Sequence, residues 1–338
     1  MRLACGWAIC ISALLLCADG TAHANAKEFD ASTITHHPRS IAYYQAYDQH
    51  LQNIGWKLAR ANADYCERTA SSIGLQLQDV TTFSDPDLAR QTLRLSGDFA
   101  VATSAQSSPA GADGSLWQSR EITHLGTANL NDLTTTKGAK WDRLKRAHDL
   151  LDQLLESRDP ISITFASGER TEIAPVRACA GRFELAADSD KLVATDERVL
   201  IGLKSKIFAY PEDMFASGVA HEFAHMVLGH TAWLDRNGRK SRHTRLTELE
   251  ADRLMPWLLA NAGYDPAAAI RFFEDYRPPS GGVLFVRGSH PRWRERVEAV
   301  ATELHQVRAL IEREGKADWR THFRRGVDPD LELAKERR

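Results

Sequence analysis

The sequence has little cysteine, almost no net charge and no internal repeat. Its 338 residues include five cysteines, and 43 basic side chains nearly balance 45 acidic ones, which gives a net charge of −2. No long basic stripe is present, so the composition gives no reason to expect nucleic acid as a partner. Beyond the N-terminal segment, no stretch approaches the ~20 apolar residues that cross a bilayer. With 43% hydrophobic and 26% charged residues, the composition is typical of a globular protein.

The N-terminal segment differs from the rest of the chain. It carries one arginine, an apolar run over 3–17, and then small residues that include "AHA" at 22–24. Small side chains at these places are typical of a leader-peptidase site. We therefore expect residues 1–24 to be a cleaved secretory signal and the protein to be periplasmic. An uncleaved anchor is the weaker interpretation because the run is short for a bilayer. Lipid attachment at Cys17 is disfavoured because bulky Leu16 precedes it.

The cysteines that would remain after cleavage are Cys66 and Cys179. An oxidising compartment favours disulfides, so we expect these two to be bonded. Two separate buried thiols are the alternative, because a bond also requires that the two Cα atoms lie close together.

Hydrophobic periodicity divides the chain into helical and short-strand parts. Strand patterns occur at 98–103 and 121–125, in a hairpin that turns at Ser167–Gly168, and in "ERVLIGLKSKIFAY". The predicted helices cover 39–63, 140–157, Pro211 to His230, 244–263 with a kink at Pro256, 266–276, and Trp293 to about Glu314. The polar segment 235–243 and the segment 277–291 are predicted loops.

The stretch 219–230, "VAHEFAHMVLGH", places three histidines and one glutamate among small apolar residues. Such groups in a buried helix either satisfy one another or hold a metal ion. On a helix, His221 and His225 point to the same side one turn apart, where both can bind one Zn²⁺. Glu222 lies beside them and can take a proton from an attacking water. His230 lies off that line, so we expect it to support the ligands or to pack in the core.

A zinc site of this kind needs a third protein ligand. The segment "TELEADR" offers Glu248, Glu250 and Asp252. Glu248 and Asp252 share one helix face while Glu250 faces nearly the opposite way, so we expect Glu248 to be the ligand. Asp252 would then orient a histidine ligand through its other ring nitrogen. A solvated acidic face is the alternative, but "LMPWLLA" follows directly and indicates a buried helix.

These motifs together resemble a known family. H-E-x-x-H with His230, "ELEAD", "NAGYDP" and "GSHPRWRER" are similar to motifs of the HtpX/Oma-type gluzincin peptidases, metallopeptidase family 48, over about 195–300. The chain is most similar to the soluble, exported BepA-like members, because no membrane segment follows the signal. "GWKLARANADYC" resembles an N-terminal helix and cysteine of some of them. Some relatives carry a PDZ-like insertion where this chain has 85–175, but the usual Gly-Asp step is missing here.

The resemblance implies roles for individual residues. The implied ligands of one Zn²⁺ per chain are His221, His225 and Glu248. Glu222 is implied as the catalytic base. His290 is implied to approach the active site, either to stabilise the oxyanion or to occupy the fourth zinc position in a latent state; a histidine that caps the next helix is the alternative. Arg296 is expected to pair with an acidic residue of the Glu248 helix, first of all Asp252.

The expected fold class is α+β: a mainly helical gluzincin-type metalloprotease domain with a small β-sheet edge and an inserted small α/β module. The expected organisation is a signal peptide at 1–24, an N-terminal helical part at 25–84, the insertion at 85–175, the zinc metallopeptidase domain at 176–314, and a charged tail at 315–338.

The expected function is a zinc-dependent endopeptidase of the bacterial cell envelope that cleaves unfolded or misassembled proteins. An extended substrate is expected to add as a strand beside "VLIGLKS", with the main chain supplying most of the affinity. The alternative is a latent or non-catalytic zinc-binding chaperone or adaptor for envelope protein assembly. The sequence gives no indication of the oligomeric state.

Overall fold

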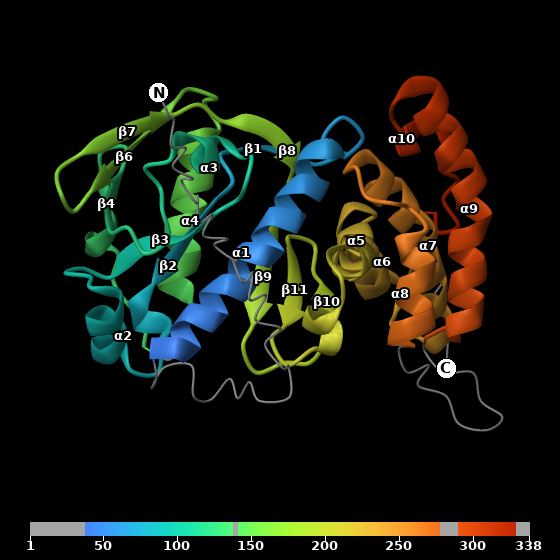
Figure 1. Cartoon of the computed structure of the whole chain (residues 1–338), viewed down its shortest axis with the longest axis horizontal. Helices are drawn as coiled ribbons and strands as arrows, with labels where there is room; N and C mark the ends of the chain where they lie inside the picture. The colour runs from blue at the N-terminus through green and yellow to red at the C-terminus, as the bar shows by residue number, and fades with distance from the viewer. Residues whose placement is uncertain (1–37, 138–140, 278–289, 329–338) are drawn as a thin grey trace, which may run out of the picture.

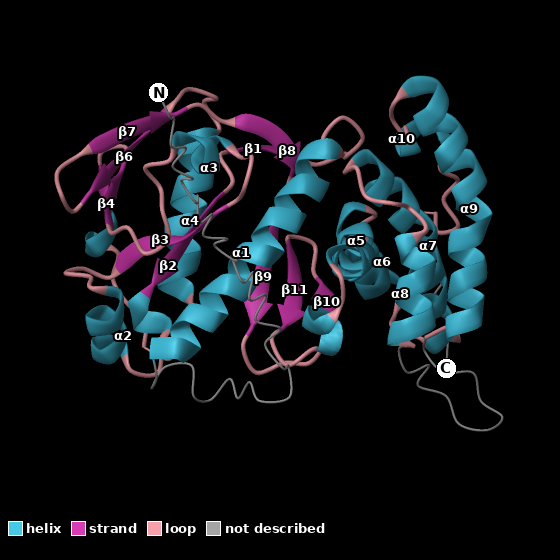
Figure 2. Cartoon of the chain, viewed as in Figure 1, coloured by secondary structure: helices cyan, strands magenta, loops and turns pink. Residues whose placement is uncertain are grey.

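The computed structural model describes residues 38–137, 141–277 and 290–328. It is an α+β protein whose two largest hydrophobic cores lie in a strand-rich part and a helix-rich part (Figures 1 and 2). We call the part with the core from Ile73 to Ile173 the small module, and the part with the larger core the main body. None of the described helices is long and apolar enough to cross a membrane. The expected signal at 1–24, with Cys17, lies outside the described residues.

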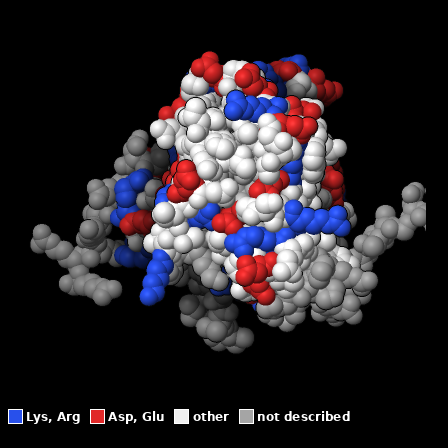
Figure 3. All heavy atoms as spheres, turned by 90° about the vertical axis from the view of Figure 1, so that its left-hand side faces the viewer, with Lys and Arg blue, Asp and Glu red and all other residues white. Residues whose placement is uncertain are grey.

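The small module is built from two antiparallel sheets and a covering helix. One sheet has the order β5-β4-β6-β7, β2 pairs with β3, and a bridge between Ala100 and Glu121 joins β3 to β4. Helix α4 packs against β2. The face of the module in Figure 3 carries acidic and basic side chains interspersed. The elements are β2 (Leu75–Asp79), α2 (Pro86–Leu93), β3 (Phe99–Ser104), α3 (Pro109–Asp113), β4 (Ile122–Leu125), β5 (Ala128–Asn129), α4 (Asp142–Leu155), β6 (Ile161–Phe165) and β7 (Arg170–Ile173).

The module core begins at Ile73, earlier than residue 85 where the sequence analysis starts the insertion. Strand β2, "LQLQD", supplies the difference, because its leucines point into the module. The hairpin expected at Ser167–Gly168 is formed by β6 and β7, and Gly168 has a positive φ of 85°.

The main body packs helices on one another and on a three-stranded sheet. Strand β11 is parallel to β9 and antiparallel to β10, in the order β10-β11-β9. Helix α7 packs between α5 and α9, and α8 packs against both α5 and α9 (Figure 1). The elements are α1 (Pro38–Ala61), β9 (Arg182–Ala186), β10 (Leu192–Ala194), β11 (Arg198–Gly202), α5 (Glu212–Val227), α6 (His230–Asn237), α7 (Ser241–Asn261), α8 (Ala268–Tyr276), α9 (Trp293–Glu314) and α10 (Trp319–His322).

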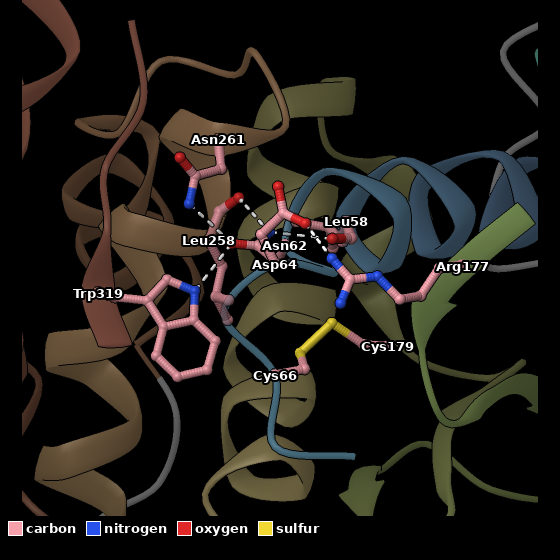
Figure 4. The surroundings of a disulfide bond; sticks show 9 residues. All are labelled: Leu58, Asn62, Asp64, Cys66, Arg177, Cys179, Leu258, Asn261 and Trp319. Atoms are coloured by element: carbon pink, nitrogen blue, oxygen red, sulfur yellow. Dashed lines mark hydrogen bonds and ion pairs between the residues drawn. A yellow bond between two sulfur atoms is a disulfide. The ribbon is translucent and has the colours of Figure 1, made fainter. Parts of the chain in front are cut away.

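The two parts are joined by a strand pair and a disulfide. β1 (Thr69–Ser72) leaves the main body and pairs antiparallel with β8 (Val176–Cys179), which returns to it. At the base of this pair, Cys66 and Cys179 form the expected disulfide, with Cα atoms 5.6 Å apart (Figure 4). Both cysteines are buried in the larger core. The disulfide therefore holds together the two chain segments that enter and leave the module.

One helix boundary differs from the prediction. The helix expected to run to His230 ends at Val227, and a second helix, α6, begins at His230. Between them Gly229 adopts φ 67°, a left-handed conformation that glycine reaches without strain. The predicted loop 235–243 shortens accordingly, because α6 continues to Asn237 and α7 begins at Ser241. Most of the predicted loop 277–291 lies outside the described residues.

The segment after Gly315, which the sequence analysis treats as a charged tail, packs onto the main body as far as it is described. Ala317, Trp319 and Phe323 belong to the larger core. The indole N–H of Trp319 donates a hydrogen bond of 3.0 Å to Asn62 Oδ1 (Figure 4). The amide of Asn62 in turn donates to the backbone carbonyl of Leu258 in α7. The C-terminal segment is thus tied to α1 and α7.

Candidate metal centre

Helix α5 carries the H-E-x-x-H residues and is buried along almost its whole length. Small residues allow this depth. A Cβ atom added to Gly218 would lie 2.2 Å from Ile207 Cδ1 and 3.1 Å from Leu192 of β10, so glycine leaves room for the ends of these two side chains against α5. One turn later His221 and His225 project from α5 toward α7, where Glu248 lies.

His221, His225 and Glu248 form a triangle of side chains, in which one ligand atom from each lies within 4.8 Å of the other two. The two Nε2 atoms lie 3.2 Å apart. Glu248 Oε2 lies 3.4 Å from His221 Nε2, and Oε1 lies 3.4 Å from His225 Nε2. A tetrahedral metal ion with bonds of about 2.1 Å separates its ligands by about 3.4 Å, which is close to the separation of the two Nε2 atoms and to the shortest distance from each of them to the Glu248 carboxylate. These residues could hold a metal ion.

The outer nitrogens of both histidines already have partners. His221 Nδ1 lies 3.0 Å from Asp252 Oδ1, and His225 Nδ1 lies 2.9 Å from His230 Nδ1. If both Nδ1 atoms donate, each neutral ring turns the lone pair of Nε2 toward the carboxylate of Glu248. Three electron-rich atoms then converge and attract a positive charge; in the structure Arg296 Nη2 lies 3.1 Å from His221 Nε2.

The pKa shifts of His221 and Glu248 also indicate that the cluster attracts a positive charge. Burial and the charge of Arg296 lower the pKa of His221, but hydrogen bonds to Asp252 and Glu248 outweigh them and raise it to about 9. Burial raises the pKa of Glu248, yet its hydrogen bonds to the two histidines hold it well below the usual range. The centre thus retains a proton on His221 at neutral pH, and a bound metal ion would displace that proton.

Arg296 from α9 lies within the same cluster and pairs with Asp252, as the sequence analysis expects. Its Nε lies 2.8 Å from Asp252 Oδ2 and its Nη2 lies 2.7 Å from Oδ1, a two-pronged contact that is buried. The same Nη2 lies 3.2 Å from Glu248 Oε2. The pair leaves Asp252 neutralised while it receives the Nδ1–H of His221, and it fixes the angle of that ring.

Glu222 lies beside the triangle and is held differently from the other charged groups. It is buried, and within the described part of the chain its carboxylate makes no hydrogen bond. Burial raises its pKa, although the nearby charges of His221 and His225 oppose the rise. A carboxylate whose pKa is raised accepts a proton more readily, as a general base requires.

His290 also reaches the cluster, from the segment before α9. Its Nε2 lies 3.7 Å from Glu248 Oε1, and its side chain is 41% exposed. Its backbone carbonyl accepts a hydrogen bond from Arg245 in α7, which anchors this end of the segment. The structure therefore brings all seven predicted metal-centre residues into one cluster: His221, Glu222, His225, Glu248, Asp252, His290 and Arg296.

A second group of contacts lies behind the triangle and was only partly anticipated. His230 Nε2 lies 2.8 Å from Glu250 Oε2. Arg325 donates from Nε to Glu250 Oε1 and from Nη2 to Oε2, both at 3.1 Å. No sequence pattern pointed to Arg325. Glu250 was expected to face away from the ligands, and it does face away from Glu248, toward His230.

The expected position of an added substrate strand is wrong. The segment "VLIGLKS" includes β11, which has a strand on each side and offers no open edge. The error arises because the short strand β10, which follows a polar turn, was not recognised as a strand. Within the described residues β10 is one of the two edges of this sheet and β9 is the other; β10 lies against α5 close to Gly218.

Comparison with protein-family models, with curated proteins and with solved structures found no match for this chain.

Proposed function

We propose that this protein is a zinc-dependent endopeptidase with a gluzincin-type fold, of the HtpX/Oma type. The observation that carries the proposal is the triangle of His221, His225 and Glu248 with the buried carboxylate of Glu222 beside it. Two imidazoles and one carboxylate at tetrahedral spacing suit zinc, and three protein ligands leave a position for water or substrate.

The roles of the chain's own residues follow from their positions. A bound zinc ion would polarise the scissile carbonyl and lower the pKa of a water molecule. Glu222 takes the proton from the attacking water and delivers it to the departing amine. Asp252, held by Arg296, keeps His221 in the tautomer that presents Nε2. Strand β10 is the edge beside which an extended peptide would add its main chain.

The proposed substrates are unfolded or misassembled proteins of the bacterial envelope. Addition of a substrate as a strand requires an extended chain, which folded proteins do not offer. The disulfide supports an oxidising compartment, and with the expected signal at 1–24 it supports the periplasm. The small module is proposed as a degenerate PDZ-like insertion. The backbone N–H of Leu77 in β2 is already occupied by His148 of α4, which reduces what that edge offers a peptide.

The first prediction concerns Glu222. Glu222→Gln keeps the size of the side chain but removes the base, so we expect casein cleavage to fall at least about 100-fold while about one zinc per chain remains bound. Cleavage and zinc content are measured on the same samples of residues 25–338. Zinc without cleavage by the wild type would contradict the peptidase proposal under those conditions, and absence of zinc would contradict the metal centre itself.

A second candidate function is a latent zinc protein that acts as a chaperone or adaptor. It is favoured by one observation, the approach of His290 Nε2 to 3.7 Å from Glu248 Oε1. If His290 blocks the open position, His290→Ala raises casein cleavage several-fold. If His290 stabilises the oxyanion, the same change lowers kcat by about 100-fold or more with little effect on KM. The kinetic constants of this one variant separate the two roles.

A further inference from the structure

The metal ligand His225 is the first member of a buried chain of contacts that ends in the C-terminal segment. The Nδ1 atoms of His225 and His230 lie 2.9 Å apart, and His230 Nε2 lies 2.8 Å from Glu250 Oε2. His230 is 1% exposed and Glu250 is 2% exposed. Each member therefore has its position set by the next one.

At the other end of this chain of contacts, residues 325–327 bond to Glu250 through one side chain and two backbone N–H groups. Glu250 Oε1 accepts hydrogen bonds from the backbone N–H groups of Gly326 at 2.7 Å and Val327 at 3.1 Å. Arg325 reaches both oxygens of the same carboxylate and also donates to the carbonyl of Leu228, at the end of α5. Residues 325–327 thus bond to α7 and to the end of the helix that carries the ligands.

The donors and acceptors along the chain of contacts have a single consistent assignment. An ionised carboxylate only accepts, so His230 donates from Nε2 to Glu250. A neutral His230 then accepts at Nδ1, which makes His225 Nδ1 the donor. The lone pair of His225 consequently lies on Nε2, the atom that faces Glu248 and His221. The tautomer of His225 that metal binding needs is therefore set by Glu250, which acts on His225 through His230.

We propose that His230 and Glu250 are positioning residues for the metal ligand His225, and that Arg325, Gly326 and Val327 complete this support. The inference rests on the proposed metal centre and extends it. His221 is oriented by the Asp252–Arg296 pair and His225 by the His230–Glu250–Arg325 chain, so each histidine ligand has its own buried ionic support.

The test is the affinity of the metal-free protein for Zn²⁺, measured by competition with a chromophoric chelator. The variants are His230→Ala, Glu250→Gln and Arg325→Leu. Loss of support behind a metal-binding histidine typically costs 10- to 100-fold in affinity, and we expect about that loss for His230→Ala and Glu250→Gln. Arg325→Leu is expected to lose about 10-fold, because the two backbone N–H groups still hold Glu250. His230→Asn, whose amide oxygen can replace Nδ1 as acceptor, is expected to recover part of the loss.

Glu303→Gln is the matched control, because Glu303 is also buried and paired with an arginine. It bonds to Arg253 and to the indole N–H of Trp257, and among the described residues neither of these has a hydrogen bond or ion pair with His221, His225 or Glu248. It should lower the melting temperature of the metal-free protein and leave Zn²⁺ affinity within about twofold of the wild type. The absorption spectrum of the Co²⁺-loaded protein gives a second readout, and we expect it to shift for Glu250→Gln and to stay unchanged for Glu303→Gln.

The outcomes separate this inference from the proposed function. Folded His230 and Glu250 variants that bind Zn²⁺ like the wild type would overturn the inference, whatever the peptidase activity. Tight binding by the wild type, weakened in the variants, supports the inference even if casein is not cleaved, which would count against the peptidase proposal alone. A wild type that binds no Zn²⁺ overturns both.

Discussion

At the scale of single residues, the metal centre is organised by how its charges are divided. Arg296 pairs with Asp252 and also lies 3.2 Å from Glu248, and Arg325 pairs with Glu250, so Glu248 is the carboxylate that a bound cation would share with Arg296. Glu222 stands apart, since burial raises its pKa and no described group donates a hydrogen bond to it. The pKa values of Glu248 and Glu250 are lowered and that of Glu222 is raised, a division that the proposed hydrolytic function would use.

Asp48 in α1 is also a buried carboxylate, but among the described residues it forms no ion pair with an arginine or lysine. Burial raises its pKa from 3.8 to about 7, and the nearby charge of Glu184 adds to the rise. The folded chain therefore holds this proton up to about pH 7, whereas the unfolded chain loses it near pH 4. Between these two pH values the free energy of unfolding falls as the pH rises. Above about pH 7 the stability due to the protonated Asp48 is fully lost.

Asp48→Asn, which stays neutral at every pH, tests this difference. We expect the free energy of unfolding of the variant, relative to the wild type, to increase between pH 4 and pH 7 by up to about 4 kcal/mol and to be level above that. Urea unfolding at pH 4.5 and pH 7.5 measures it. Asp188→Asn is the control, because Asp188 is 86% exposed and the change should be the same at both pH values. An equal effect of Asp48→Asn at both pH values would show that Asp48 ionises normally.

Much of the metal centre could be predicted at this scale, because helical spacing fixes which side chains share a face. His221 with His225, and Glu248 with Asp252, are such pairs. Arg325 could not be predicted, because its contact with Glu250 depends on how a segment 75 residues away in sequence folds back. His230 was left undecided because its direction depends on the break in the helix at Gly229.

At the scale of elements, helix α1 and strand β9 pack closely against each other. A Cβ atom added to Gly55 of α1 would lie 2.3–2.8 Å from ring atoms of Phe183 in β9. Within a helix, alanine is normally more stable than glycine by about 0.5–1 kcal/mol. The sign of the Gly55→Ala effect therefore reports whether the two elements touch as closely as the structure shows.

We expect Gly55→Ala to lower the free energy of unfolding by about 1–3 kcal/mol, because the aromatic ring has to move out of a packed core. Chemical denaturation of the wild type and the variant provides the measurement. In the double variant with Phe183→Leu, which frees space, the loss due to alanine should be smaller than in the single variant. A stabilising Gly55→Ala would mean that α1 lies further from β9.

The elements themselves were predicted best where they are long. The pattern at Trp293–Glu314 predicted α9 at both ends, and the pattern at 39–63 predicted most of α1. Short elements were missed, among them β2, β10 and α6, because a strand of three to five residues or a helix restarted after one glycine has too few residues to show a period. Because β10 was missed, β11 was wrongly predicted to be an open edge of the sheet.

At the scale of the whole molecule, the disulfide is the covalent link between the two ends of the small module. Cys66 and Cys179 are separated by 113 residues in sequence, and both are buried. Closing so long a loop reduces the entropy of the unfolded chain by an amount worth about 4–5 kcal/mol in the chain-entropy model. The metal triangle lies in other elements, α5 and α7, so loss of the bond should act on stability and not on the ligands.

The double variant Cys66→Ala/Cys179→Ala is expected to lose about 2–5 kcal/mol of unfolding free energy and to keep its Zn²⁺ affinity in the folded state. Thermal unfolding and zinc titration measure the two quantities. Addition of a thiol reductant should lower the melting temperature of the wild type and leave that of the double variant unchanged. Weaker zinc binding by the folded double variant would contradict this separation of the module junction from the metal centre.

The same junction has a consequence for protein engineering. The chain leaves the main body near Cys66 and returns near Cys179, and the two Cα atoms are 5.6 Å apart. Successive Cα atoms are about 3.8 Å apart, so one or two residues could close this gap if everything between were removed. The module could thus be replaced by a different recognition domain whose two ends lie close together. The helices that carry the histidines would keep their sequence and their order.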